Sequence, residues 1–171
     1  KTMLQKWPEL SNARLYLGFG DGAMANIGSK CTNIERVAVT VGTSAALRVV
    51  VPTTEMNDTP LPSGLWCYSI DKEHSLLGGA LTDGGSVHEF LNQIIPISTE
   101  EISSSNSTSI PVKDRHDDLV VLPFLSGERS PGWNDHARAT IHGINRYTTK
   151  SDLRLAMYES VCLRLCSVFN L

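Results

Sequence analysis

An isolated carboxylate and a pair of hydroxyls stand on two glycine-bearing turns near the start of this 171-residue chain. Asp21 lies in the first turn, GFGDG, and Thr43 and Ser44 directly follow Gly42 in the second, VGTSA. Glycine lets a backbone approach a ligand and aim its N–H groups at it, and the hydroxyls add donors, which suits an oligophosphate. A carboxylate beside such a cradle can take the proton of a hydroxyl that attacks a phosphoryl group. We therefore expect Asp21 to act as a general base next to a phosphate held at Gly42–Ser44.

A later glycine pair extends this hypothesis. Gly84 and Gly85 directly precede a stretch, Val87–Ile95, whose apolar residues recur at helical spacing. The N-terminus of a helix presents unpaired N–H groups and the positive end of the helix dipole, so these glycines could supply further donors to the phosphates.

Other interpretations of the same residues stay open. An aspartate in a glycine turn is often only a turn former. The segment from Gly18 to Gly22 loosely imitates a dinucleotide-binding fingerprint, but the next strand does not end in the carboxylate that would hold a ribose. Glu128 and Arg129 either brace a polar connector or contact substrate. The five histidines show no metal-ligand spacing, so we expect no structural metal site.

The elements that must position these residues follow from the apolar pattern. Strands precede helices repeatedly, and two adjacent hairpins favour an α/β fold with a mixed sheet rather than a purely parallel one. The expected strands are 37–40, 46–51, 65–70, 75–81, a buried strand at 119–125, and 137–144. A final helix is expected after a cap at Thr149 or Ser151, and the serine-rich segment 98–112 is expected to be a surface loop.

Composition narrows the class of protein. A hydrophobic content of 41% and a charged content of 19% are typical of a globular domain with its own core. The net charge of −3 gives no reason to expect nucleic acid or an anionic membrane as a partner. No apolar run approaches the roughly 20 residues that span a bilayer, and we see no signal peptide. The first residue is Lys1 rather than Met, which fits a piece of a longer chain.

The four cysteines include no CxxC pair, so a reducing cytoplasm is the expected location. Cys162 and Cys166 are four residues apart, and we expect both to pack in the core from one face of the final helix.

Four blocks of sequence resemble a known family. They are GDGAMANIGS at 20–29, VAVTVGTSAALR at 37–48, LPFLSGERSPGWNDHAR at 122–138, and ATIHGI at 139–144 with the downstream DL and AMYE of the final helix. In order and spacing they are similar to the FGGY carbohydrate kinases, and within them to the gluconokinase and xylulokinase branch. Ala45 departs from the pattern, since glycine is commoner there.

The resemblance implies an actin-like ATPase (ribonuclease H-like) fold, in which residues 1–171 form part of the C-terminal lobe. It implies ATP-dependent phosphorylation of a sugar or sugar-acid hydroxyl, with gluconate favoured, and ATP and Mg²⁺ as cofactors. A non-catalytic, kinase-like binding module is the alternative.

The resemblance also implies roles for individual residues. Asp21 is expected to be the catalytic base, Gly42, Thr43 and Ser44 to contact the ATP phosphates, and Gly84 to lie against the nucleotide. Asp21, Glu128 and Arg129 are the candidate substrate contacts. The N-terminal lobe would be the missing partner, without which this piece alone is expected to be inactive, and a homodimer is left open.

Overall fold

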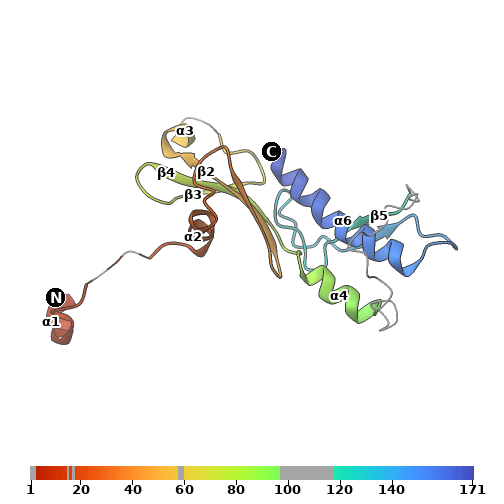
Figure 1. Ribbon diagram of the computed structural model, residues 1–171, viewed down its shortest axis with the longest axis horizontal. Helices are drawn as coiled ribbons and strands as arrows, with labels where there is room; N and C mark the ends of the chain where they lie inside the picture. The colour runs from red at the N-terminus through yellow and green to blue at the C-terminus, as the bar shows by residue number, and fades with distance from the viewer. Residues whose placement is uncertain (1–2, 15, 17, 58–59, 97–117) are drawn as a thin grey trace.

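A four-stranded antiparallel sheet lies at the centre of the chain in a computed structural model that describes residues 3–14, 16, 18–57, 60–96 and 118–171 (Figure 1). Its strands follow the order β1-β2-β4-β3, with every neighbouring pair antiparallel. The strands are β1 (Val37–Val41), β2 (Ala45–Pro52), β3 (Trp66–Ser69) and β4 (His74–Leu81).

Both hairpins expected from the sequence are therefore confirmed. The expected mixture of parallel and antiparallel pairs is wrong for this sheet: its described strands pair only antiparallel, because each hairpin lays its strands antiparallel and β2 joins β4 in the same sense.

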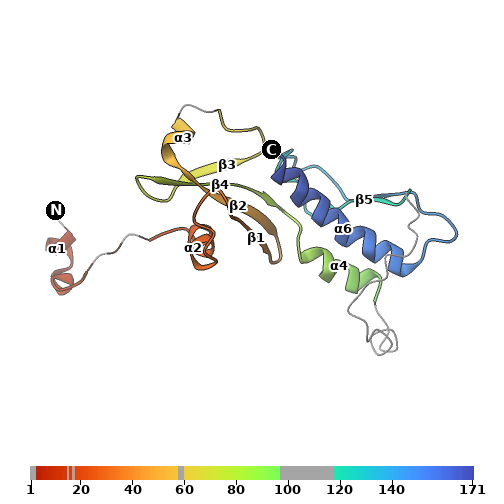
Figure 2. The same ribbon diagram turned by 45° about the horizontal axis from the view of Figure 1, so that its top comes forward.

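Helices lie on both faces of this sheet. The longer ones are α2 (Asp21–Gly28), α4 (Ser86–Ile94) and α6 (Lys150–Phe169), and the short ones are α1 (Met3–Lys6), the 3₁₀ helix η1 (Pro8–Leu10) and α3 (Thr53–Asn57). Figures 1 and 2 show α2 beside the sheet, α4 and α6 together at the end of the sheet where β4 leads into α4, and α1 apart from the rest. A second, two-stranded sheet joins β5 (Val120–Leu122) to β6 (Thr140–His142) beside α6.

The alternation of side chains along β2 assigns each face to its helix, because successive residues of a strand point to opposite sides. Val50 packs with Ala23 of α2 and Leu76 of β4 in one cluster. Ala45 belongs to the larger cluster on the opposite face, where α4 and α6 lie.

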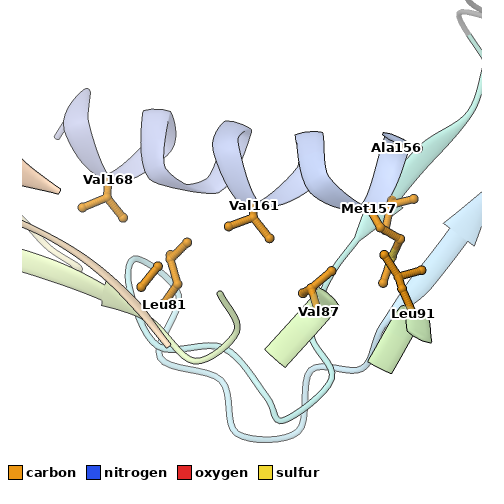
Figure 3. Packing of buried hydrophobic residues seen from close by; sticks show 9 residues of the cluster. Leu81, Val87, Leu91, Ala156, Met157, Val161 and Val168 are labelled. Carbon is orange, nitrogen blue, oxygen red and sulfur yellow. The ribbon is translucent and has the colours of Figure 1, made fainter. Parts of the chain in front are cut away.

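The larger cluster is the main core of the described residues. Apolar side chains of α6 point down onto the end of β4 and onto α4 (Figure 3). Its buried members include Leu81, Val87, Leu91, Met157, Val161 and Val168. The helix α6 begins at a capping box in which the side chains of Thr149 and Asp152 each accept from the other's backbone N–H, so the predicted cap at Thr149 is confirmed.

Two expectations about burial are wrong. The strand β5 is shorter than the predicted 119–125, and only its central residue is buried, while Val120 and Leu122 are 53% and 44% exposed. Cys162 and Cys166 lie on the exposed side of α6 rather than in the core, because the helix turns Met157 and Val161 inward instead.

The serine-rich segment 98–112 lies outside the described residues. Within the part of the chain that the structure describes, no helix combines the length and apolar character needed to cross a bilayer.

Candidate active site

Asp21 is the first residue of α2, directly after Gly20, which caps the helix in an extended conformation. The sequence had predicted a turn at Asp21, whereas in the structure this residue opens a helix. The Asp21 carboxylate is exposed and accepts a 2.7 Å hydrogen bond from the N–H of Gly22. The ion pairs of the described residues do not include it. A negative side chain in the first turn is favoured by the helix dipole, and this one is open to an incoming ligand.

The start of α2 rests on two side chains of the sheet, Arg48 from β2 and Tyr68 from β3. Gly22 is buried against them, and a Cβ at this position would lie 3.1 Å from both the Arg48 Nε and the Tyr68 hydroxyl. The wholly buried Asn26, one turn along the helix, donates 3.3 Å hydrogen bonds to the carbonyls of Arg48 and Cys31. These contacts fix the position of Asp21 relative to β2.

The second turn, Gly42–Ser44, joins β1 to β2 and is exposed at all three residues. The Gly42 N–H donates to the Ser44 carbonyl at 2.8 Å, which closes the turn. Among the described residues, neither the Thr43 nor the Ser44 hydroxyl has a hydrogen-bond partner within the chain, so both can donate to a ligand.

The turn is held from behind by the N-terminus of α4. The N–H groups of Gly84 and Ser86 donate to the Thr43 carbonyl at 3.0 and 3.1 Å, and the Gly85 N–H donates to the Gly42 carbonyl at 2.6 Å. The prediction that the N–H groups of Gly84 and Gly85 reach the phosphates is therefore wrong, because the carbonyls of the turn already occupy them. Gly84 packs closely against the turn, and its contact with the nucleotide stays a prediction. A Cβ there would lie 2.7 Å from the Ser44 carbonyl carbon.

The start of α2, which carries Asp21, thus packs against the hairpin whose bend is the hydroxyl-bearing turn. Arg48, which underlies the start of α2, is four residues from Ser44 along β2, a separation of about 13 Å at the usual rise of a strand. Asp21 therefore adjoins the part of β2 that begins four residues after Ser44, and its closeness to Gly42–Ser44 in the complete site stays a prediction.

Glu128 and Arg129 lie elsewhere, in the connector on the α6 side of the sheet. The Glu128 carboxylate forms an ion pair with Arg164 of α6, and Arg164 also donates to the Ser130 carbonyl at 2.9 Å. The side chains of this pair are only 15% and 18% exposed. Glu128 therefore has the bracing role that the sequence had left open as one alternative, whereas the Arg129 side chain is exposed.

Three polar residues near this region were missed by the sequence prediction. Arg48 and Asn26 support α2, and the buried Asp83 accepts from the Ser86 hydroxyl at 3.1 Å and the Ser126 N–H at 3.2 Å. A charged residue inside the apolar run AALRVVV was the available signal for Arg48. Asn26 and Asp83 gave no comparable signal, since each also bonds to a residue distant in sequence, Arg48 and Ser126 respectively.

The described residues contain no group of three or more histidine, cysteine, aspartate or glutamate side chains that could hold a metal ion. The Mg²⁺ that the resemblance implies therefore finds no ligand set in this part of the chain, and no step below depends on it.

Comparison with known proteins identifies the architecture. Over 164 residues the chain is 27% identical to a gluconokinase of Bacillus subtilis (strain 168), which covers 90% of this chain and 31% of that protein. It is 26% identical over 165 residues to a glycerol kinase of Rhizorhabdus wittichii, covering 94% of this chain and 32% of that protein. The crystal structure of a ligand-bound xylulose kinase from Lactobacillus acidophilus matches with a TM-score of 0.75 and 30% identity, over 98% of this chain and 33% of that one.

The chain thus spans about a third of the length of the relatives that it matches. Its fold is the actin-like ATPase fold of these sugar kinases, so the expected fold class is confirmed. Residues 37–170 match the C-terminal domain of the FGGY family of carbohydrate kinases, with β1 and α6 at the two ends of the match. This chain belongs to the FGGY family of carbohydrate kinases.

Proposed function

We propose that the complete protein transfers the γ-phosphoryl group of ATP to a hydroxyl of a sugar or sugar acid, with Asp21 as the general base. The observation that carries this proposal is the exposed carboxylate at the start of α2, a helix that packs against the hairpin carrying the exposed hydroxyls of Thr43 and Ser44. A carboxylate near the nucleophile and donors on the phosphates are the two parts that phosphoryl transfer asks of a protein.

The proposed step moves one proton and exchanges one bond. The Asp21 carboxylate takes the proton of the sugar hydroxyl as the hydroxyl oxygen bonds to the γ-phosphorus. The bond from that phosphorus to the oxygen it shares with the β-phosphate breaks, and its electron pair leaves with ADP. The hydroxyls of Thr43 and Ser44 donate to phosphate oxygens, while α4 fixes the backbone of their turn.

Gluconate is the favoured substrate, supported by the similarity to the gluconokinase of Bacillus subtilis. Arg129, exposed in the connector, is retained as a candidate substrate contact, while Glu128 is committed to Arg164. The N-terminal lobe of the kinase is the proposed partner that completes the site, and Mg²⁺ is proposed to accompany ATP. Cytoplasm is the proposed location.

The test uses the complete protein, assayed for ADP release with gluconate, xylulose and glycerol. Turnover with one of these sugars is expected in the wild type. In Asp21→Asn the amide cannot accept the proton, and we expect kcat to fall by roughly 100- to 10,000-fold, the usual contribution of a general base. Affinity for ATP, measured by calorimetry, is expected to stay within about threefold. Retained turnover in the variant would remove Asp21 from the role of base.

A further inference from the structure

A cationic side chain lies between the proposed base and the proposed phosphate turn. Arg48 stands near the middle of β2, on the face that α2 covers, and is half-buried. Its Nε lies beside Gly22, the residue that follows Asp21, where a Cβ would come within 3.1 Å of it. The guanidinium is therefore in contact with the first turn of α2.

The other end of the guanidinium points toward the Gly42–Ser44 turn. Arg48 Nη1 donates to the Thr40 hydroxyl at 3.1 Å. Arg48 itself is paired with Ala38 across the hairpin, whereas Thr40 is paired with Ala46, two residue pairs nearer the turn and therefore on the same face. Thr40 precedes Gly42 by two residues, about 7 Å of strand. The side chain thus spans from the helix that carries Asp21 toward the turn that carries the two hydroxyls.

The charge of Arg48 is available to a ligand. Among the described residues, no carboxylate forms an ion pair with it, and Nη1 is the guanidinium nitrogen that donates within the chain. A guanidinium stays protonated throughout the physiological pH range and presents a planar set of donors that matches the oxygens of a phosphoryl group.

We propose that Arg48 is a further catalytic residue, which donates hydrogen bonds to the phosphoryl group as it passes from ATP to the sugar. The proposal rests on the proposed function. Arg48 gains and loses no proton; it stabilises the charge on the oxygens of the transferring group while the proton goes to Asp21 and the electron pair leaves with ADP. Its direction toward Thr40 and the turn favours a phosphoryl oxygen over the carboxylate of a sugar acid as its ligand.

The test compares Arg48→Gln and Arg48→Lys in the complete protein, with Arg36→Gln as the matched control. Arg36 lies in the loop before β1 and donates to the Lys30 carbonyl, so its loss removes the same charge away from the site. For Arg48→Gln we expect kcat to fall by roughly 100- to 1,000-fold with acidic and neutral sugars alike, since one donor to a developing charge is worth about that much. KM for the sugar is expected to stay within about threefold. Arg48→Lys should recover only part of the rate, because an ammonium lacks the planar fork.

A binding measurement separates this role from a merely structural one. Calorimetry with ADP, aluminium fluoride and sugar, which together mimic the phosphoryl group in transfer, should show weaker binding in Arg48→Gln, while ADP alone binds as in the wild type. Equal binding of the fluoride complex, or full kcat, in Arg48→Gln overturns the proposal. So does a rise in KM confined to gluconate with glycerol and xylulose unaffected, because that pattern assigns Arg48 to the carboxylate of the sugar acid.

Two further outcomes are decided in advance. If Arg48→Gln melts well below the wild type, Arg48→Lys decides: wild-type kcat there overturns the proposal. If the wild type turns over no sugar, the proposed function fails. The binding of ADP with aluminium fluoride then decides by itself whether Arg48 contacts the phosphoryl group.

Discussion

Replacement of Gly84 by alanine tests how α4 holds the phosphate turn. The added Cβ would lie 2.7 Å from the Ser44 carbonyl carbon, 2.8 Å from its oxygen and 3.0 Å from the Ala45 nitrogen. All three are backbone atoms, so the clash cannot be relieved by the rotation of a side chain. Either α4 or the Gly42–Ser44 turn must move.

The magnitude follows from the contacts that such a movement strains. Overpacking of this kind costs about 1–3 kcal/mol. The hydrogen bonds from Gly84 and Ser86 to the Thr43 carbonyl contribute roughly 0.5–1.5 kcal/mol each and would lengthen. In a domain of 150–250 residues each lost kcal/mol lowers the melting temperature by about 2–4 °C. A shift of the turn by about 1 Å misplaces the phosphates and is expected to lower kcat roughly 100-fold.

The assay is a thermal melt and a steady-state ADP-release assay on the complete protein, with Gly28→Ala as the control. Gly28 ends α2, and a Cβ there meets no atom within 4 Å. Alanine at this position should leave kcat unchanged and stability equal or higher, because alanine favours a helix by about 1 kcal/mol over glycine. Gly84→Ala with the melting temperature and kcat of the wild type would refute the account of the turn.

Two other predictions involve residues of α6. Glu128→Gln should lower the free energy of unfolding by about 1–3 kcal/mol, since it leaves the Arg164 guanidinium largely buried without its partner charge. In thermal melts, the double variant Glu128→Gln with Arg164→Met should be more stable than Glu128→Gln alone. No gain in stability would contradict a specific pairing of Glu128 with Arg164. In the 171-residue chain, iodoacetamide should alkylate the exposed Cys162 and Cys166 before Cys67. Burial raises the pKa of the Cys67 thiol more than its hydrogen bond with Ser75 lowers it, so a smaller fraction of Cys67 is the reactive thiolate at a given pH. Peptide mass spectrometry gives the order, and Cys67 reacting first would contradict it.

The hairpins and the final helix could be predicted from the sequence because their signals are local. The glycine-bearing turn at Gly42 follows a short apolar run, and Thr149 with Asp152 forms a cap within four residues. Asp21 and Gly42–Ser44 could be proposed as a site because both stand on short, glycine-marked turns.

The supports of that site could not be predicted, because they join residues distant in the chain. Asn26 reaches β2 across 22 residues, and Glu128 meets Arg164 across 36. The N–H groups at the start of α4 were predicted to face the phosphates, yet in the structure they bind the turn from behind. Only the docking of α4 on the hairpin decides between these two arrangements. The exposure of Cys162 and Cys166 likewise depends on which stripe of α6 meets the core.

The support of α2 by Arg48 has a mechanical consequence. The helix that carries the acid is braced against β2, and the hydroxyl-bearing bend joins β1 to β2, so the separation of acid and bend is set inside one packed unit. A lobe closing over this one would change the distance from the sugar to both groups together, without altering the spacing between them. Closure would then bring the sugar hydroxyl to the site, while the arrangement of the acid and the phosphate-binding bend is already present in this lobe.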